Sequence, residues 1–311
     1  MTRIGHIIGL LLFALACAAP ATARTLQVGP DKPYKLPSAA IGDARDGDTV
    51  QIAAGKYADC AVVPANNLVI EGLGADASAV LADKSCADKA LLVTDGTNIT
   101  IRNLTLAGAR SSFHNGAGIR AEGKNLTIEH VKFIDDEDGI LAAGVPGSTI
   151  TIRDSEFTRD GSCEGSCAHG VYIGGPIALV HIEHSKFFET RHGHHIKSRA
   201  LRTEVIGCDI RDGPDGTASY EIEAPNGGSL VVRDNIIEKG PQAENHTAMI
   251  MIGAEGVTQP TREITIEHNR VRNDGSFPTV FVYNMTATRA VLKGNELSGI
   301  IEPLHGNGTV E

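Results

Sequence analysis

Residues 192–199 carry the densest group of titratable side chains in the sequence. Three histidines, a lysine and an arginine lie within eight residues, in the order His192-Gly-His194-His195-Ile-Lys197-Ser-Arg199. A lysine beside an arginine suits chemistry on an acidic sugar, because the arginine neutralises a carboxylate and disfavours the charged form of the lysine, which lowers its pKa. We therefore expect a functional site here, and a solvated ladder of ion pairs is the alternative.

Two flanking segments repeat the spacing of this group. Tyr172 lies 25 residues before Lys197, and Glu221 lies 24 residues after it. If each interval is one coil of stacked strands, the three side chains stack about 4.8 Å apart on one face. Their apolar neighbours, such as Ile196, set the outward direction. The same alternation adds three outward residues on these coils: His195, Arg199 and Glu223.

This cluster suits β-elimination on a uronate-containing polysaccharide. The reaction needs a base for the proton α to the carboxylate, neutralisation of that carboxylate, and an acid for the leaving oxygen. We expect Lys197 as the base, Arg199 or a bound cation as the neutralising charge, and Tyr172 or His195 as the acid. Four further residues are expected to bind substrate: His169, His194, Glu221 and Asn226.

Glu221 and Glu223 leave three interpretations open. They can bind Ca²⁺ together with Asn226, since hard cations take oxygen ligands. They can be the acid and base of a glycoside hydrolase, because neighbouring outward positions on a strand lie about 6.5 to 7 Å apart. They can also simply pair with Lys197. A non-catalytic carbohydrate-binding or structural protein would carry the same residues.

The elements that position these residues form an internal repeat. Nine short segments alternate apolar and polar residues and end at Gly, Asn or Asp, and their centres are 23 to 34 residues apart. The central residues are Ile70, Ile101, Ile128, Ile152, Ile182, Val205, Val232, Ile266 and Leu292. The intervals leave no room for the helices of an α/β fold, and one repeat cannot bury its apolar face alone. The sequence predicts an all-β solenoid of about nine coils.

Many of the coils have a second expected strand, and further features complete the domain. Second strands begin at residues 118, 139, 170, 195, 220 and 249. Residues 36–45 are expected to form a short helix that caps the first coil. Disulfides are expected between Cys60 and Cys86 and between Cys163 and Cys167, with Cys208 buried and free. One domain covers residues 24–311.

Residues 46–57, Asp-Gly-Asp-Thr-Val-Gln-Ile-Ala-Ala-Gly-Lys-Tyr, resemble the opening coil of right-handed parallel β-helix proteins of the pectate-lyase-like superfamily. The segments 169–174, 193–200 and 219–228 resemble an exported bacterial subgroup of these proteins that has no settled activity. The resemblance implies a single-stranded right-handed β-helix. In the polysaccharide lyases of this fold, a Lys/Arg pair acts with calcium. Here the Lys and Arg lie on one strand, not on neighbouring coils.

The first 23 residues read as a secretory signal peptide. Arg3 precedes an apolar run over residues 7–16, and Ala21-Thr22-Ala23 supplies the cleavage site. The run is too short to span a membrane. We expect a periplasmic or secreted protein that begins near Arg24. The net charge of −10 argues against nucleic acid as a partner, so we expect a monomer that acts on an acidic polysaccharide or oligosaccharide.

Overall fold

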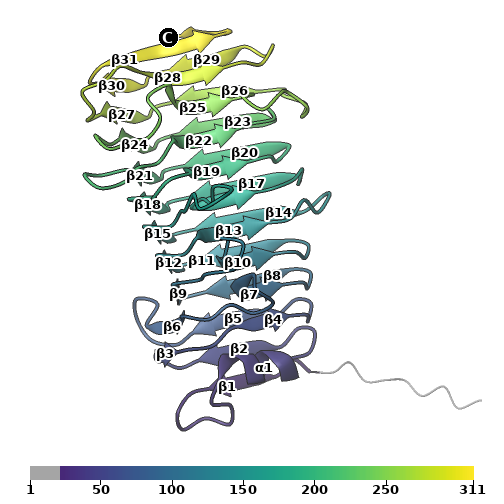
Figure 1. Cartoon of the computed structure of the whole chain (residues 1–311). Coiled ribbons are helices and arrows are strands. Elements are labelled where there is room, and N and C mark those ends of the chain that lie inside the picture. The colour runs from purple at the N-terminus through teal and green to yellow at the C-terminus, as the bar shows by residue number, and fades with distance from the viewer. Residues whose placement is uncertain (1–21) are drawn as a thin grey trace, which may run out of the picture.

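Short strands wind into a stack of coils in the computed structural model, which describes residues 22–311 (Figure 1). Three parallel sheets, here named A, B and C, run the length of the stack, and each takes one strand from successive coils. The predicted right-handed parallel β-helix is confirmed. The predicted signal peptide lies outside the described residues except for its last two positions.

Sheet A contains the nine repeats found in the sequence. Its register aligns their central residues, for example Ile128 with Ile101 and with Ile152. Within residues 22–311 the sheet has twelve strands, nine of which carry these repeats, and sheets B and C have ten strands each, in agreement with the expected stack of about nine coils. The strands are β1 (Thr25–Val28), β2 (Thr49–Ile52), β5 (Val69–Gly72), β8 (Ile99–Arg102), β11 (Leu126–Glu129), β14 (Thr149–Arg153), β17 (Leu179–Glu183), β20 (Arg202–Ile206), β23 (Ser229–Arg233), β26 (Ile264–Glu267), β29 (Ala290–Lys293) and β32 (Gly308–Val310).

Sheet C contains the further strands that the sequence predicts after the repeats, and it carries the residues singled out for chemistry. Its ten strands are β4 (Ala61–Val63), β7 (Ala90–Thr94), β10 (Ala117–Ala121), β13 (Asp138–Ala142), β16 (Val171–Ile173), β19 (His194–Ser198), β22 (Tyr220–Ala224), β25 (Ala248–Ile252), β28 (Thr279–Asn284) and β31 (Ile301–Gly306).

Sheet B is a third strand of each coil that the repeat pattern does not reveal, because its strands are only three or four residues long. The strands are β3 (Gly55–Tyr57), β6 (Ala79–Ala82), β9 (Leu104–Ala107), β12 (Lys132–Ile134), β15 (Glu156–Thr158), β18 (Lys186–Phe188), β21 (Asp209–Arg211), β24 (Ile236–Lys239), β27 (Arg270–Asn273) and β30 (Glu296–Ser298). Runs this short give no alternation to detect.

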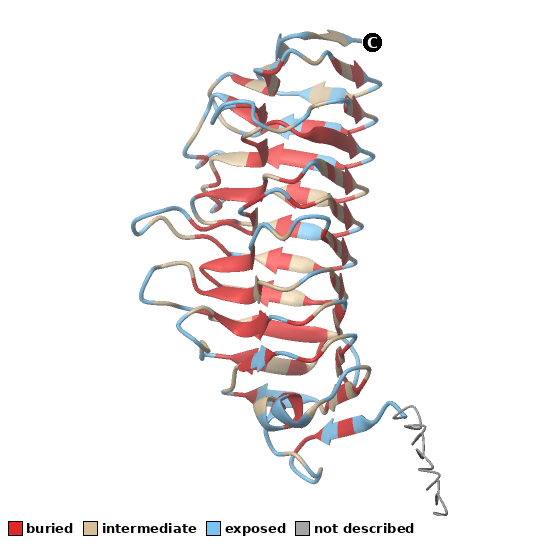
Figure 2. Cartoon of the chain, turned by 90° about the vertical axis from the view of Figure 1, so that its right-hand side faces the viewer, coloured by how far each residue is buried: buried red, intermediate tan, exposed pale blue. Residues whose placement is uncertain are grey.

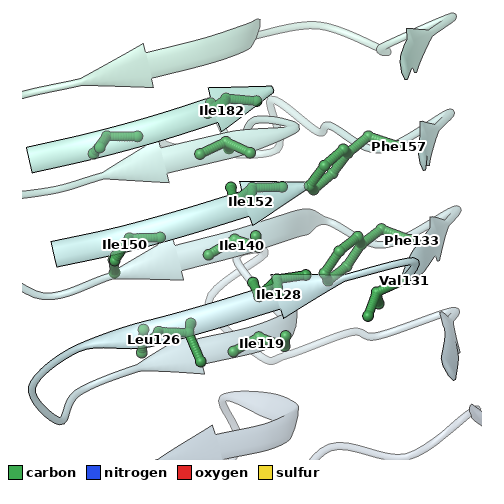
Figure 3. Close-up of a cluster of buried hydrophobic side chains, with 14 of the residues drawn as sticks. Ile119, Leu126, Ile128, Val131, Phe133, Ile140, Ile150, Ile152, Phe157 and Ile182 are labelled. Atoms are coloured by element: carbon green, nitrogen blue, oxygen red, sulfur yellow. The ribbon is translucent and has the colours of Figure 1, made fainter. Parts of the chain in front are cut away.

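Inward side chains form apolar ladders between the sheets. Buried residues recur in the strands of coil after coil along the stack (Figure 2). Leu126, Ile128 and Phe133 fill one coil, and Ile150, Ile152 and Phe157 fill the next (Figure 3). Phe133, Phe157 and Phe187 stack with ring centroids 4.5 and 4.6 Å apart. Burial of each such side chain stabilises the folded state by roughly 1.5–3 kcal/mol. The stacking of similar coils therefore builds the apolar core.

The amino-terminal end of the stack is covered by α1 (Pro37–Asp43), which packs against β1, β2 and β4 and lies within the predicted capping segment. Both predicted disulfides are formed, Cys60–Cys86 and Cys163–Cys167, and Cys208 is buried and free. Among residues 22–311, no helix is long and apolar enough to cross a membrane.

Strict alternation fails at one position of sheet C. Gly118 and Gly139 each precede an inward isoleucine, and the strand register passes over them. A Cβ at either would lie 2.7 Å from a ring atom of Phe133 or Phe157, so the position faces the core. Later coils place His195 and Glu221 there, and both are fully buried. Two consecutive residues therefore point inward on these strands.

Candidate functional site

One outward column crosses three successive strands of sheet C. The register pairs Tyr172 of β16 with Lys197 of β19, and Lys197 with Glu223 of β22. The sequence predicts Tyr172 and Lys197 in this column correctly but names Glu221 as the third member. The prediction fails because β22 has two consecutive inward residues, Glu221 and Ile222. The residue of β22 that pairs with Lys197 is therefore Glu223, two positions after Glu221.

Lys197 lies between two carboxylates. Its side chain is 11% exposed, and its Nζ is 2.9 Å from Glu223 Oε2 and 2.6 Å from Glu255 Oε1. Burial acts to lower the pKa of Lys197, but Glu223 and Glu255 outweigh burial and raise this pKa above its ordinary value. The expected lowering of the Lys197 pKa is therefore wrong, and the side chain is an ammonium group, not a free base.

Arg199 follows β19 and connects three partners. Its Nε and Nη2 atoms each donate to Tyr172 Oη at 3.4 Å, and Nη2 also lies 2.6 Å from Glu255 Oε2. Nη1 donates to Asn226 Oδ1. The tyrosine ring lies beside both cations, with Lys197 Nζ 5.9 Å and Arg199 Cζ 5.8 Å from its centroid. The phenol oxygen thus accepts hydrogen bonds from Arg199, and Lys197 lies beside the ring.

Two buried histidines lie beside this column. His169 Nδ1 accepts the backbone N–H of His194 at 3.0 Å, and the His169 ring centroid is 4.8 Å from that of Tyr172. Burial, followed by the charges of His194, Lys197 and Arg199, holds the pKa of His169 well below its usual range. His169 is therefore neutral with its proton on Nε2. His194 Nε2 lies 2.8 Å from Glu223 Oε2.

These side chains line a pocket of about 360 Å³. His169, Tyr172, His194 and Lys197 contribute from sheet C and its preceding loop. The disulfide-closed loop of residues 163–167 supplies one wall through Ser166 and Cys167. Three residues of earlier coils complete the lining: Asn115, Asp138 and Leu141. The pocket is large enough for part of a sugar chain.

Larger hollows of about 480 and 570 Å³ lie over the outer face of sheet B and share Arg211, Glu238 and Arg272. The two arginines are more than a third exposed and pair with neighbouring aspartates, Arg211 with Asp209 and Arg272 with Asp274. Pairs of this kind are usual on a solvated surface and contribute little. We therefore place the candidate site in the sheet C pocket.

His195 and Glu221 do not belong to this site. His195 lies inside the β-helix, with Nδ1 2.7 Å from Thr190 Oγ1 and Nε2 3.0 Å from Asp212 Oδ1. Glu221 lies inside as well, 3.2 Å from Lys239 Nζ, and burial raises its pKa to about 8. Neither can touch a substrate on the outer face. The expected roles of His195 as the acid and of Glu221 in substrate binding are wrong for this reason.

The expected calcium ligands are dispersed in the same way. Glu221 is paired with Lys239 in the interior, Glu223 with Lys197 and His194, and Asn226 with Arg199. These three residues do not form a ligand set for Ca²⁺. Across residues 22–311, no group of three His, Cys, Asp or Glu side chains is placed to hold a metal ion. The Glu221–Glu223 pair of the glycoside hydrolase alternative is not formed either.

Glu255 and Tyr220 are members of the cluster that the sequence does not reveal. Glu255 lies in the loop after β25, outside the repeated strands, where no periodic signal could mark it. Tyr220 begins β22, and its ring centroid lies 5.1 Å from that of His194. Strict alternation places Tyr220 in the interior, because it does not allow for two consecutive inward residues on β22.

No family model and no curated protein matches the chain. Solved structures do match. The alginate lyase from Paenibacillus sp. str. FPU-7 is 19% identical over 92% of this chain and 99% of its own, with a TM-score of 0.58. Pectate lyase Pel9A is 12% identical over 94% and 79%, also with a TM-score of 0.58. At these identities the likeness shows that the chain shares the parallel β-helix fold of these proteins.

Proposed function

We propose that this protein is an exported polysaccharide lyase that cleaves a uronate-containing glycan by β-elimination. The observation that carries the proposal is the position of the Tyr172 hydroxyl, which accepts N–H groups of Arg199 in a pocket that also holds Lys197. β-Elimination needs positive charge at the substrate carboxylate and a group that moves a proton beside it. The cluster brings both together.

Each side chain has a role in this proposal. Lys197 and Arg199 bind the uronate carboxylate and stabilise the negative charge that develops on it when the α proton leaves. The Tyr172 hydroxyl oxygen takes that proton while its own O–H proton passes to the leaving glycosidic oxygen, so the phenol is regenerated. His169 donates a hydrogen bond from Nε2 to the sugar. Lys197 thus acts as an electrostatic group, in place of the base expected from the sequence.

Two further observations support the proposal. The structural neighbours include an alginate lyase and a pectate lyase, whose names describe enzymes that act on acidic polysaccharides. The two disulfides suit an oxidising compartment, as expected for a periplasmic or secreted protein. We propose that the protein acts there as a monomer.

The test is an assay of the purified protein with a panel of acidic glycans. A lyase produces unsaturated uronates, which add ultraviolet absorbance, in step with new chain ends. New reducing ends without this absorbance would identify a hydrolase instead. Binding without either product would identify a carbohydrate-binding module. The last two results would each overturn the proposal.

A further inference from the structure

The Glu255 carboxylate bridges the two cations of the site. Oε1 lies 2.6 Å from Lys197 Nζ, and Oε2 lies 2.6 Å from Arg199 Nη2. Both carboxylate oxygens are therefore used, one for each cation. This is the arrangement in which a lysine and an arginine would hold the carboxylate of a bound acidic sugar.

Lys197 contacts a second carboxylate, Glu223, and burial separates the two. The Glu223 side chain is 3% exposed and also lies 2.8 Å from His194 Nε2. The Glu255 side chain is 42% exposed and extends from a loop. Removing a buried, doubly paired carboxylate is costly, whereas an exposed ion pair opens easily. Only Glu255 can give up its place to a carboxylate from solution.

The loop that carries Glu255 is fixed by its backbone. Glu255 N–H donates to Pro225 O at 2.9 Å, and Gly253 N–H donates to Ala224 O at 2.9 Å. Asn226 Nδ2 donates to Gly256 O at 3.0 Å. Gly253 and Gly256 have φ values of 87° and 92°, which favour glycine. Exchange therefore needs only a rotation of the Glu255 side chain, with the loop in place.

From this geometry we infer that Glu255 occupies the subsite of a substrate carboxylate and competes with it for Lys197 and Arg199. The inference rests on the proposed function for its ligand class, a uronate. A uronate replaces one carboxylate by another and leaves both cations paired. A neutral sugar cannot do this, because displacing Glu255 would leave Arg199 without a carboxylate partner and Lys197 with Glu223 alone. Lys197 and Arg199 thus make the subsite selective for unesterified acidic sugars, and Glu255 lowers the affinity with which such sugars bind.

The test measures binding of D-glucuronate and of D-glucose, its counterpart without a carboxylate, to the full-length protein by calorimetry. In Glu255→Gln the competing charge is gone. If the bridge is closed for about nine-tenths of the time, the affinity for glucuronate rises about tenfold. Glucose affinity stays unchanged. Glu255→Ala should give the same direction of change, and thermal unfolding checks that both variants are folded.

The control variant is Glu263→Gln. Glu263 is 45% exposed and pairs with an arginine, Arg202, at 2.7 Å, so it matches Glu255 in exposure and charge but lies away from the pocket. Its glucuronate affinity should equal that of the wild type. Unchanged or weaker glucuronate binding by Glu255→Gln, or no binding by either protein, would overturn the inference. Tighter binding by a variant that yields no unsaturated product would retain the subsite and overturn the lyase proposal alone.

Discussion

Lys197 and Glu223 occupy matched positions on neighbouring strands of sheet C, with Nζ 2.9 Å from Oε2. Burial acts to raise the pKa of Glu223, but His194 and Lys197 outweigh it and lower this pKa. The carboxylate is therefore ionised and holds both partners toward the pocket. This contact explains why Lys197 carries a full charge, which suits it to neutralise a substrate.

Loss of the Lys197 charge should impair turnover. We expect Lys197→Ala to lower kcat on a cleavable glycan by about two to three orders of magnitude, as for removal of one electrostatic stabiliser. The fold should survive, because the side chain lies outside the apolar core. Glu129→Ala on β11 of sheet A is the control and should be neutral. Equal rates for both variants would contradict the assigned role.

Tyr172→Phe removes the proposed proton-transfer group and little else. We expect kcat to fall by about two to four orders of magnitude, the usual weight of general acid–base catalysis, with a small change in KM. Arg199 keeps Glu255 and Asn226 as partners, so the pocket should persist. Initial rates from ultraviolet absorbance measure the effect, and a kcat within tenfold of the wild type would exclude Tyr172 as this group.

His195 should matter for stability, not for chemistry. His195→Ala leaves Asp212 Oδ1 and Thr190 Oγ1 without the buried histidine that each contacts, which costs about 1–3 kcal/mol before any cavity effect. Denaturant unfolding measures this loss. Turnover by the folded fraction should stay close to that of the wild type. A large fall in kcat without loss of stability would restore the catalytic role that the sequence suggested.

The two disulfides should have separable effects. Cys60 and Cys86 are 26 residues apart, and Cys163 and Cys167 are four apart. The loop-entropy relation assigns about 3.5 kcal/mol to the longer loop and about 2 kcal/mol to the shorter one. We expect Cys60→Ser/Cys86→Ser to lower stability more. Cys163→Ser/Cys167→Ser should raise KM, because Cys167 lines the pocket. Equal KM values for both double variants would argue against a role for this wall.

Asp160 should make stability fall as pH rises. It is fully buried, its Oδ1 accepts the Asp136 N–H at 2.9 Å, and burial raises its pKa to about 8. The unfolded carboxyl titrates near 3.9, so between about pH 4 and 8 the folded state holds the extra proton. The extra proton favours the folded state at low pH. The free energy of unfolding therefore falls by at most about 1.4 kcal/mol per pH unit as the pH rises toward 8.

In Asp160→Asn the side chain no longer titrates, but its amide oxygen can still accept the Asp136 N–H. Urea unfolding at pH 5 and pH 7 should therefore show a weaker decline in stability than in the wild type. Asp136 and Glu221, whose pKa values burial also raises, remain in both proteins. Because the Asp160 charge also raises the pKa of Asp136, the difference between the two declines belongs to the Asp136–Asp160 pair. Identical declines would show that Asp160 is ionised in the folded state.

The fold could be predicted because each coil repeats the same signal. Ile128 and Ile152 are matched positions of one ladder, and alternation around them is regular. The site could be predicted only in part, because strict alternation fails on β19 and β22. There His195 and Glu221 point inward, and so does the isoleucine that follows each of them. Three glycines hold this position in earlier coils and give no side chain to reveal its direction. Glu255 is in a loop, where tertiary contacts alone place it.

The pairing of each coil with only its two neighbours also shapes how the protein unfolds. Stability of such a stack is a sum of coil and interface contributions, without contacts that tie the first coil to the last. Either end can therefore open while the middle stays closed. The pocket residues run from Asn115, just before β10, to Lys197 on β19, with several coils on each side. Fraying at an end would reach the pocket last, so binding should outlast the first loss of β structure on heating.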